Sequence, residues 1–155
     1  MDNVNVIRVG FFCPEIKIAD INGEIADPID RSGDMLTCLL FVNDDEIGTA
    51  AIRDIETGLP KTDSGYQVQI STILPDKIHV AKAFNEKHGF KVRLFCDSEL
   101  RLGKAFSIVD SHQAKPSYHP FVFIVGDEGS LRYRQEIGPE GLDSQLLRQK
   151  TKHLI

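Results

Sequence analysis

The hydrophobic residues of the chain gather in short runs with the length and spacing of β-strands. Residues 35–42 (MLTCLLFV) are apolar almost without interruption, a pattern typical of a strand buried on both faces. Residues 67–73 (QVQISTI) alternate polar and apolar side chains, which predicts a second strand. A short run over residues 92–95 predicts a third.

Helical spacing appears between these runs. Ile78, Ala81 and Phe84 lie three residues apart, which predicts a helix with one buried face. Pro75 suits its first turn, where no amide donor is needed, and Gly89 suits its C-terminal cap. Further helices are predicted over residues 49–57, 98–105 and 140–154.

Turn residues complete the order of elements. Asn22-Gly23 predicts a tight hairpin with positive φ angles between residues 17–20 and 24–26. Residues 126–129 (GDEG) predict a second hairpin between strands at 121–125 and 131–135. Alternating strands and helices indicate an α/β fold whose mostly parallel sheet is closed by an antiparallel pair. No repeat or linker interrupts the chain, so residues 1–155 are expected to form a single domain.

Four segments carry a resemblance to a known family. They are residues 14–23 (PEIKIADING), Leu74-Pro75 with residues 83–85 (AFN), residues 94–108, and residues 123–129 (FIVGDEG). In this order they resemble the peroxiredoxin superfamily, the alkyl hydroperoxide reductase and thiol-specific antioxidant group, and most of all its thiol peroxidase branch. The resemblance implies a thioredoxin-like central mixed sheet flanked by helices, with an N-terminal β-hairpin. It also implies peroxide reduction and pairing into homodimers.

The segment that carries the peroxidatic cysteine in this family contains no cysteine here. The family pattern is a proline, a threonine and then the cysteine, at a helix N-terminus that favours the thiolate. Thr49 matches the threonine, which puts the missing cysteine at Ala51 or Ile52, or at Ala50 if the gap is placed differently. The next cysteine after Cys38 is Cys96, so no shift of the alignment restores the site.

Two further positions of the resemblance are altered. The resolving cysteine of the thiol peroxidase branch falls at Asn85, and the arginine before the penultimate strand is absent from the sequence at 118–121 (YHPF). Pro120 instead resembles the proline that thioredoxins place, in cis, beside their active site. Thr49, Ala50, Ala51, Ile52, Asn85 and Pro120 are therefore interpreted as a vestigial site.

The remaining thiols offer an alternative. Cys38 lies within the apolar run at 35–42 and is expected to be buried and inert. Cys96 ends a strand, and Asp97 and Glu99 beside it disfavour a thiolate. Cys13 is expected to be the most accessible of the three. A divergent thiol peroxidase or thiol–disulfide oxidoreductase would have to use Cys13 or Cys96.

Charge and composition exclude several classes of function. The net charge of −5 and the lack of a concentrated basic face argue against nucleic acid as a partner. No apolar run reaches the length of a membrane span, and the first residues (MDNVN) lack a signal-peptide pattern, so a cytoplasmic location is expected. The spacing of cysteines and of His112 and His119 fits no metal site. No cofactor is expected.

The sequence therefore predicts a pseudoenzyme, a peroxiredoxin-like scaffold that has lost the peroxidase apparatus. Its binding surface, the former active-site face, is expected over residues 43–52 and 111–120 and the nearby strand ends. The chain is expected to act as a binding or regulatory module, and its expected partner is a protein. A small-molecule or metal binder that uses the acidic loop of Asp44, Asp45 and Glu46 is a third hypothesis.

Overall fold

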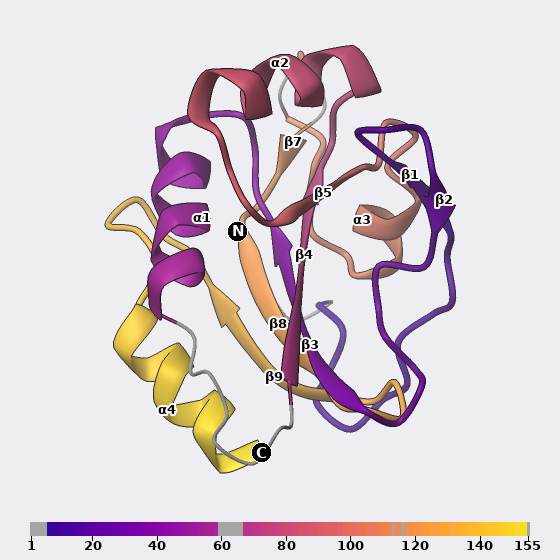
Figure 1. Cartoon of the computed structure of the whole chain (residues 1–155), viewed down its shortest axis with the longest axis vertical. Helices are drawn as coiled ribbons and strands as arrows, with labels where there is room; N and C mark the ends of the chain where they lie inside the picture. Colours follow the sequence, from indigo (N-terminus) through magenta and orange to yellow (C-terminus); the bar gives the residue numbers. More distant parts are fainter. Residues whose placement is uncertain (1–5, 59–66, 113, 116, 155) are drawn as a thin grey trace.

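The computed structural model describes residues 6–58, 67–112, 114–115 and 117–154. Within these ranges, seven strands form a mixed sheet in the order β2-β1-β5-β4-β3-β8-β9 (Figure 1). The strands are β1 (Ile18–Asp20), β2 (Ile25–Ala26), β3 (Met35–Phe41), β4 (Gln67–Leu74), β5 (Arg93–Cys96), β8 (Phe121–Val125) and β9 (Leu131–Glu136).

The middle of the sheet is parallel and its edges are antiparallel. β3 and β5 both run parallel to β4, with Cys38 opposite Ile70 and Cys96 opposite Leu74. β8 runs antiparallel to β3, and β1 runs antiparallel to β5. The predicted α/β architecture, with an N-terminal β-hairpin at one edge and an antiparallel pair at the other, is confirmed.

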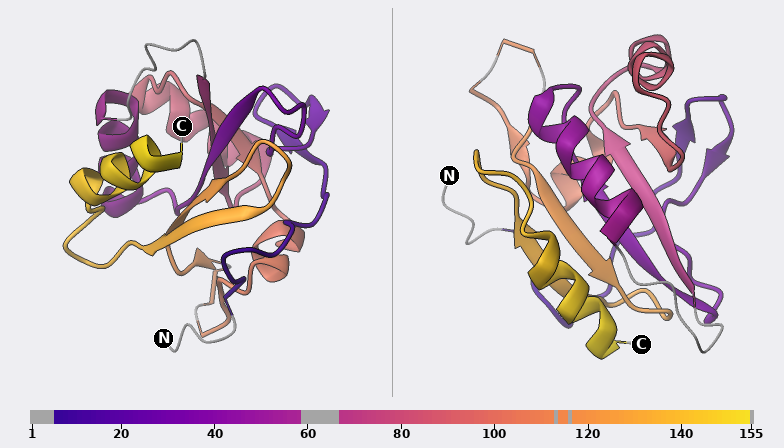
Figure 2. Two further views of the ribbon diagram at one scale, coloured as in Figure 1. Left: turned by 90° about the horizontal axis from the view of Figure 1, so that it is seen from below. Right: turned by 60° about the vertical axis from the view of Figure 1, so that its left-hand side comes forward.

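Helices cover the two faces of the sheet unequally. α1 (Glu46–Gly58) and α4 (Ser144–Leu154) lie side by side on one face (Figure 2), and α2 (Ile78–His88) packs Ala81 and Phe84 into the same core. α3 (Arg101–Ala105) and the N-terminal segment that includes Val6 and Cys13 pack on the other face. Each face therefore has its own buried cluster of apolar side chains.

Several predicted boundaries are wrong for local reasons. α1 begins three residues before the predicted Thr49, because the Asp45 carboxylate accepts a hydrogen bond from the Gly48 amide (2.8 Å) and caps the helix. Pro75 does not open α2, which begins at Ile78. The Gly89 cap is confirmed, with φ of 65° and its amide bonded to the Asn85 carbonyl oxygen.

Other differences concern turns and short elements. In the first hairpin only Gly23 has a positive φ, of 83°, because the Asp20 carboxylate holds the turn by accepting the amides of Asn22 and Glu24. α4 begins at Ser144 and not at residue 140. A small antiparallel pair, β6 (Val109–Asp110) and β7 (Ser117–Tyr118), was not predicted. In the part of the chain that the structure describes, no helix has the length and apolar character to cross a bilayer.

Candidate functional site

Polar residues directly follow the three parallel strands at their carboxyl ends. Asn43 and Asp44 come just after β3, Asp76 after β4 and Asp97 after β5. Because these strand ends meet at one edge of the sheet, the four side chains come from distant parts of the sequence to a shared region. In open α/β sheets this is the edge where ligands bind.

Asp97 holds the other elements of this edge in place. Its buried carboxylate accepts hydrogen bonds from the Leu102 amide (3.1 Å), the Gly103 amide (2.8 Å) and the Tyr118 hydroxyl (2.7 Å). Burial and the neighbouring carboxylate of Asp97 raise the pKa of Tyr118 well above its usual value, so the phenol stays protonated and donates. One carboxylate thus joins β5 to α3 and β7.

Asn43 joins the loop after β3 to β7. Its side-chain amide donates to the Tyr118 carbonyl oxygen (3.0 Å), and its side-chain oxygen accepts from the Tyr118 amide (2.8 Å). The side chain therefore pairs with the Tyr118 backbone as a neighbouring strand would. This pairing fixes where the main chain enters α1.

Lys115 reaches into the same edge from the β6–β7 loop. Its ammonium lies 3.1 Å from Oδ1 of Asp44 and 3.3 Å from Oδ1 of Asp76. The Asp76 side chain is only 2% exposed. Burial and the Asp44 carboxylate raise the pKa of Asp76 even though Lys115 opposes the shift. Ionised Asp76 is therefore costly to the folded chain and depends on Lys115 for compensation.

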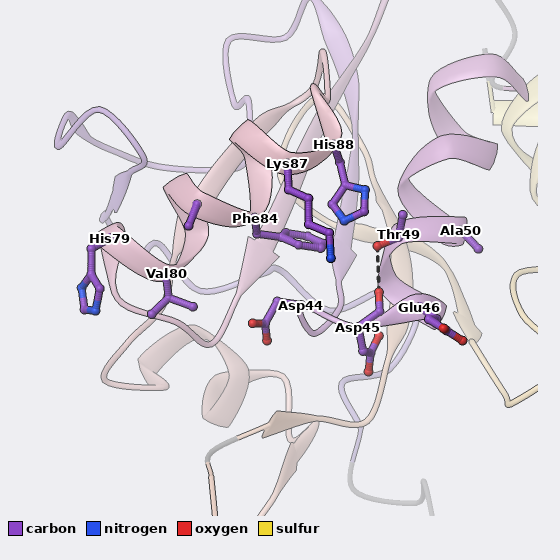
Figure 3. A pocket seen from close by; sticks show the side chains of 11 residues that line it. Asp44, Asp45, Glu46, Thr49, Ala50, His79, Val80, Phe84, Lys87 and His88 are labelled. Carbon is purple, nitrogen blue, oxygen red and sulfur yellow. Dashed lines mark hydrogen bonds between the residues drawn. The ribbon is translucent and has the colours of Figure 1, made fainter.

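A groove of about 820 Å³ lies between α1 and α2. That volume falls within the range of ligand sites. In Figure 3, Phe84 lies at the centre of the groove, with Lys87 and His88 on one side and Asp45 on the other. The remaining residues that line it are Asp44, Glu46, Thr49, Ala50, His79, Val80 and Ala83.

The predicted vestigial positions divide between this groove and the core. Thr49 and Ala50 line the groove, whereas Ala51 and Ile52 lie on the buried face of α1, in the hydrophobic core. The Thr49 hydroxyl donates to the Asp45 carbonyl oxygen (2.8 Å) within the helix. Of these four positions, only Thr49 and Ala50 are therefore placed to contact a ligand in the groove.

Asn85 and Pro120 are not among the residues that line the groove. Asn85 is half-buried on α2, and its buried side-chain oxygen has no hydrogen-bond partner among the described residues. The peptide bond before Pro120 is trans, unlike the bond before the thioredoxin proline that Pro120 resembles in sequence. The Pro120 carbonyl oxygen accepts the Ile137 amide (2.9 Å), which gives this residue a structural role.

All three cysteines are free and buried. Cys13 is 3% exposed, Cys38 0% and Cys96 6%, so the expectation that Cys13 is the accessible thiol is wrong. Burial raises the pKa of Cys38 to about 12. Burial also raises the pKa of Cys13 to about 11, although the Arg31 guanidinium opposes it, and that of Cys96 to about 11, with help from Asp76 and Asp20.

The thiols are also poorly placed for a disulfide. Cys38 pairs with Ile70 of β4 and Cys96 with Leu74, so the two lie two strand spacings apart and four residues apart along the strands. That places their α-carbons roughly 16 Å apart, far beyond the reach of a disulfide. Cys13 belongs to the core on the opposite face of the sheet.

The histidines and acids offer no metal cluster. Among the described residues, no group of three or more His, Cys, Asp or Glu side chains is arranged to hold a metal ion. His79 and His88 line the groove, and His88 stacks on the ring of Phe90 (5.3 Å between centroids).

Lys115 lies within the binding surface expected at residues 111–120, but sequence reasoning had not singled out Asp76, and had read Asp97 only as a neighbour of Cys96. A signal was present for the two acids, since each comes within two residues of the end of a predicted strand. The ion pairs of Lys115 with Asp44 and Asp76 could not be predicted, because they join segments that are distant in the sequence.

No model of a known protein family matches the chain, and no curated protein does. Solved structures match over nearly the whole chain. A peroxiredoxin-like protein from Aquifex aeolicus is 18% identical with a TM-score of 0.83, covering 97% of this chain and 89% of that one. A thiol peroxidase from Chromobacterium violaceum is 13% identical with a TM-score of 0.76, covering 96% and 88%.

The mitochondrial 2-Cys peroxiredoxin from Plasmodium falciparum is 19% identical with a TM-score of 0.69, covering 94% of this chain and 93% of that one. At these identities the similarity establishes the fold. The chain has the thioredoxin-like fold of the peroxiredoxin type.

Proposed function

We propose that this chain is a member of the peroxiredoxin superfamily that does not reduce peroxide with its own thiols and instead binds a partner through the former active-site face. One observation carries the proposal: all three thiols are buried, with pKa values of about 11 to 12. A single domain over residues 1–155, homodimer formation and a cytoplasmic location belong to the same proposal.

The raised pKa values make a peroxidatic thiol unfavourable. The thiolate attacks peroxide, and a thiol with a pKa near 11 is ionised at pH 7 in roughly one molecule in ten thousand. Burial adds a second barrier, since peroxide must reach the sulfur. The two effects act together on every cysteine of the chain.

The N-terminus of α1 is also poorly suited to a thiolate. Asp44 and Asp45 precede the helix and Glu46 occupies its first turn, where a helix dipole otherwise favours an anion. These carboxylates already occupy the positions that the helix dipole favours for an anion. The Asp45 carboxylate also accepts a hydrogen bond from the Gly48 amide. An added thiolate would meet negative charge there.

The competing function is a divergent thiol enzyme. For Cys13, the nearby Arg31 guanidinium favours the thiolate. However, that guanidinium already pairs with Asp27 (2.9 Å) and donates to the Pro14 carbonyl oxygen (3.0 Å). Burial outweighs it, and the pKa of Cys13 stays raised. Cys96 faces carboxylates and has no such support.

Reaction of the reduced native protein with Ellman's reagent tests the proposal. We expect no thiol to react within minutes at pH 7.5, because none is exposed, and three to react after unfolding in guanidinium chloride. Rapid reaction of one thiol in the native protein would favour the enzyme. Cys13→Ser and Cys96→Ser variants would then identify it.

A further inference from the structure

We propose that the acidic edge formed by Asp44 and Asp76 receives a lysine or arginine side chain of a partner protein, whose neighbouring apolar side chains occupy the groove between α1 and α2. This inference rests on the binding role proposed above and names the chemistry of the partner. In the free protein Lys115 occupies this site, and the basic side chain of the partner displaces it.

Lys115 shows that this edge accommodates an ammonium group. Its Nζ contacts one carboxylate oxygen of Asp44 and one of Asp76, and its side chain as a whole is 63% exposed. Only the tip is engaged, and the side chain is attached to a surface loop. It can leave for solvent without moving any buried apolar group.

The edge retains acceptor capacity that Lys115 does not use. Oδ2 of Asp76 is buried and has no hydrogen-bond partner among the described residues. Leaving a buried carboxylate oxygen without a donor is costly. A guanidinium, or an ammonium placed closer to Asp76, can supply the missing donor.

The charges around this edge favour a cation. A cavity of about 300 Å³ next to Lys115 is lined by the carboxylates of Asp44, Asp45 and Asp110, with Lys115 as its basic residue. The other basic groups near the edge, Lys87, His79 and His88, lie on α2, where they line the groove. An acidic segment would meet three carboxylates, so charge complementarity selects a basic one.

The groove supplies the apolar part of the same site. Asp44 and Asp45 line both cavities, so the two lie next to each other. Val80, Ala83 and Phe84 form apolar surface of the groove. Val80 and Phe84 are labelled in Figure 3. A short segment with a basic side chain beside leucine-like side chains matches both parts at once.

A peptide titration tests this inference. The probe is acetyl-Leu-Ala-Lys-Leu-amide, compared with peptides in which norleucine or glutamate replaces the lysine. We expect the lysine peptide to shift the ¹⁵N–¹H signals of Asp44, Asp76 and Tyr118, and to bind at least ten-fold more tightly than the norleucine peptide. We expect no binding of the glutamate peptide.

Two variants distinguish binding at this site from nonspecific binding of the peptide. Lys115→Ala removes the internal competitor and should tighten binding of the lysine peptide several-fold. Asp76→Asn should weaken it at least ten-fold and yet raise the melting temperature at pH 7. The melting temperature rises because the pKa of Asp76 is raised in the folded chain, so its ionisation destabilises the fold at neutral pH.

The stability gain of Asp76→Asn should shrink as the pH falls through the raised pKa of folded Asp76, and should be lost below the ordinary aspartate pKa of 3.8, where the carboxyl is protonated in both states. Asp34→Asn, on an exposed loop, is the matched control and should change neither binding nor melting temperature. A higher melting temperature in Asp76→Asn also shows that the loss of binding is not unfolding.

Equal binding of the lysine and norleucine peptides, binding of neither, or no effect of Lys115→Ala would overturn the inference. These outcomes are independent of thiol reactivity. If the thiols are unreactive and the lysine peptide fails, only the identity of the partner is wrong. If a thiol reacts rapidly in the native protein, the proposed function itself fails.

Discussion

Replacing Asp97 by alanine is expected to lower the free energy of unfolding by about 3–5 kcal/mol. The substitution leaves three buried donors without their acceptor: the amides of Leu102 and Gly103 and the hydroxyl of Tyr118. Among the described residues no other side chain accepts a hydrogen bond from these donors, and Asp97, Leu102 and Tyr118 are each at most 2% exposed. Urea unfolding followed by circular dichroism measures the loss.

Tyr118→Phe is the matched control for this prediction. It removes one donor and leaves the two amide bonds to Asp97 intact, so a loss of about 1–2 kcal/mol is expected. The double variant should lose less than the sum of the two, because both changes break the same hydrogen bond. Equal losses for Asp97→Ala and Tyr118→Phe would contradict the role assigned to Asp97.

Gly48→Ala is expected to lower the free energy of unfolding by about 2–4 kcal/mol, although alanine is the better helix former. A β-carbon at this position would overlap the main-chain oxygen of Asn43. That oxygen cannot move freely, because the Asn43 side chain is bonded twice to the Tyr118 backbone. We therefore also expect the ¹⁵N–¹H signal of Tyr118 to shift.

Gly58→Ala, at the other end of α1, controls for helix propensity. Among the residues that the structure describes, the β-carbon would meet only the Arg148 guanidinium, at 3.4 Å, and the backbone needs no positive φ. Stability should be unchanged or rise by up to about 1 kcal/mol. If Gly48→Ala were as well tolerated as Gly58→Ala, Gly48 would not lie as close to the main-chain oxygen of Asn43, in the loop between β3 and α1, as the structure places it.

The strands were predictable because their signals are local. The apolar run of β3 and the alternation of β4 each depend on side chains only a few residues apart, and both predictions are confirmed. Helix starts were predicted less well. The start of α1 depends on a single capping carboxylate at Asp45, within a loop that looks uniformly acidic in the sequence.

The candidate site was predictable only in part, because it is assembled by contacts between distant residues. Of the four positions that the resemblance assigns to the vestigial site on α1, Thr49 and Ala50 line the groove, whereas Ala51 and Ile52 belong to the core. The pair formed by Lys115 and Asp76 spans 39 residues of sequence. Nothing local indicates that a lysine on one loop will meet a buried aspartate on another.

The accessibility of the cysteines also depends on tertiary packing. Cys13 precedes a proline in a segment without regular structure, which suggested an exposed thiol. In the folded chain its amide donates to the Gly129 carbonyl oxygen (2.9 Å), and this contact ties the segment to the β8–β9 turn. The side chain is thereby buried in the apolar cluster on the face of the sheet that α3 covers.

Intact mass after exposure of the fully reduced protein to low hydrogen peroxide and dimedone tests the central claim most directly. Dimedone traps a sulfenic acid, the first product of a thiolate that attacks peroxide. We predict that no adduct forms and that all three thiols survive, because each is buried with a raised pKa. A rapid, stoichiometric adduct at Cys13 or Cys96 would contradict the account and identify a peroxidase with a relocated thiol.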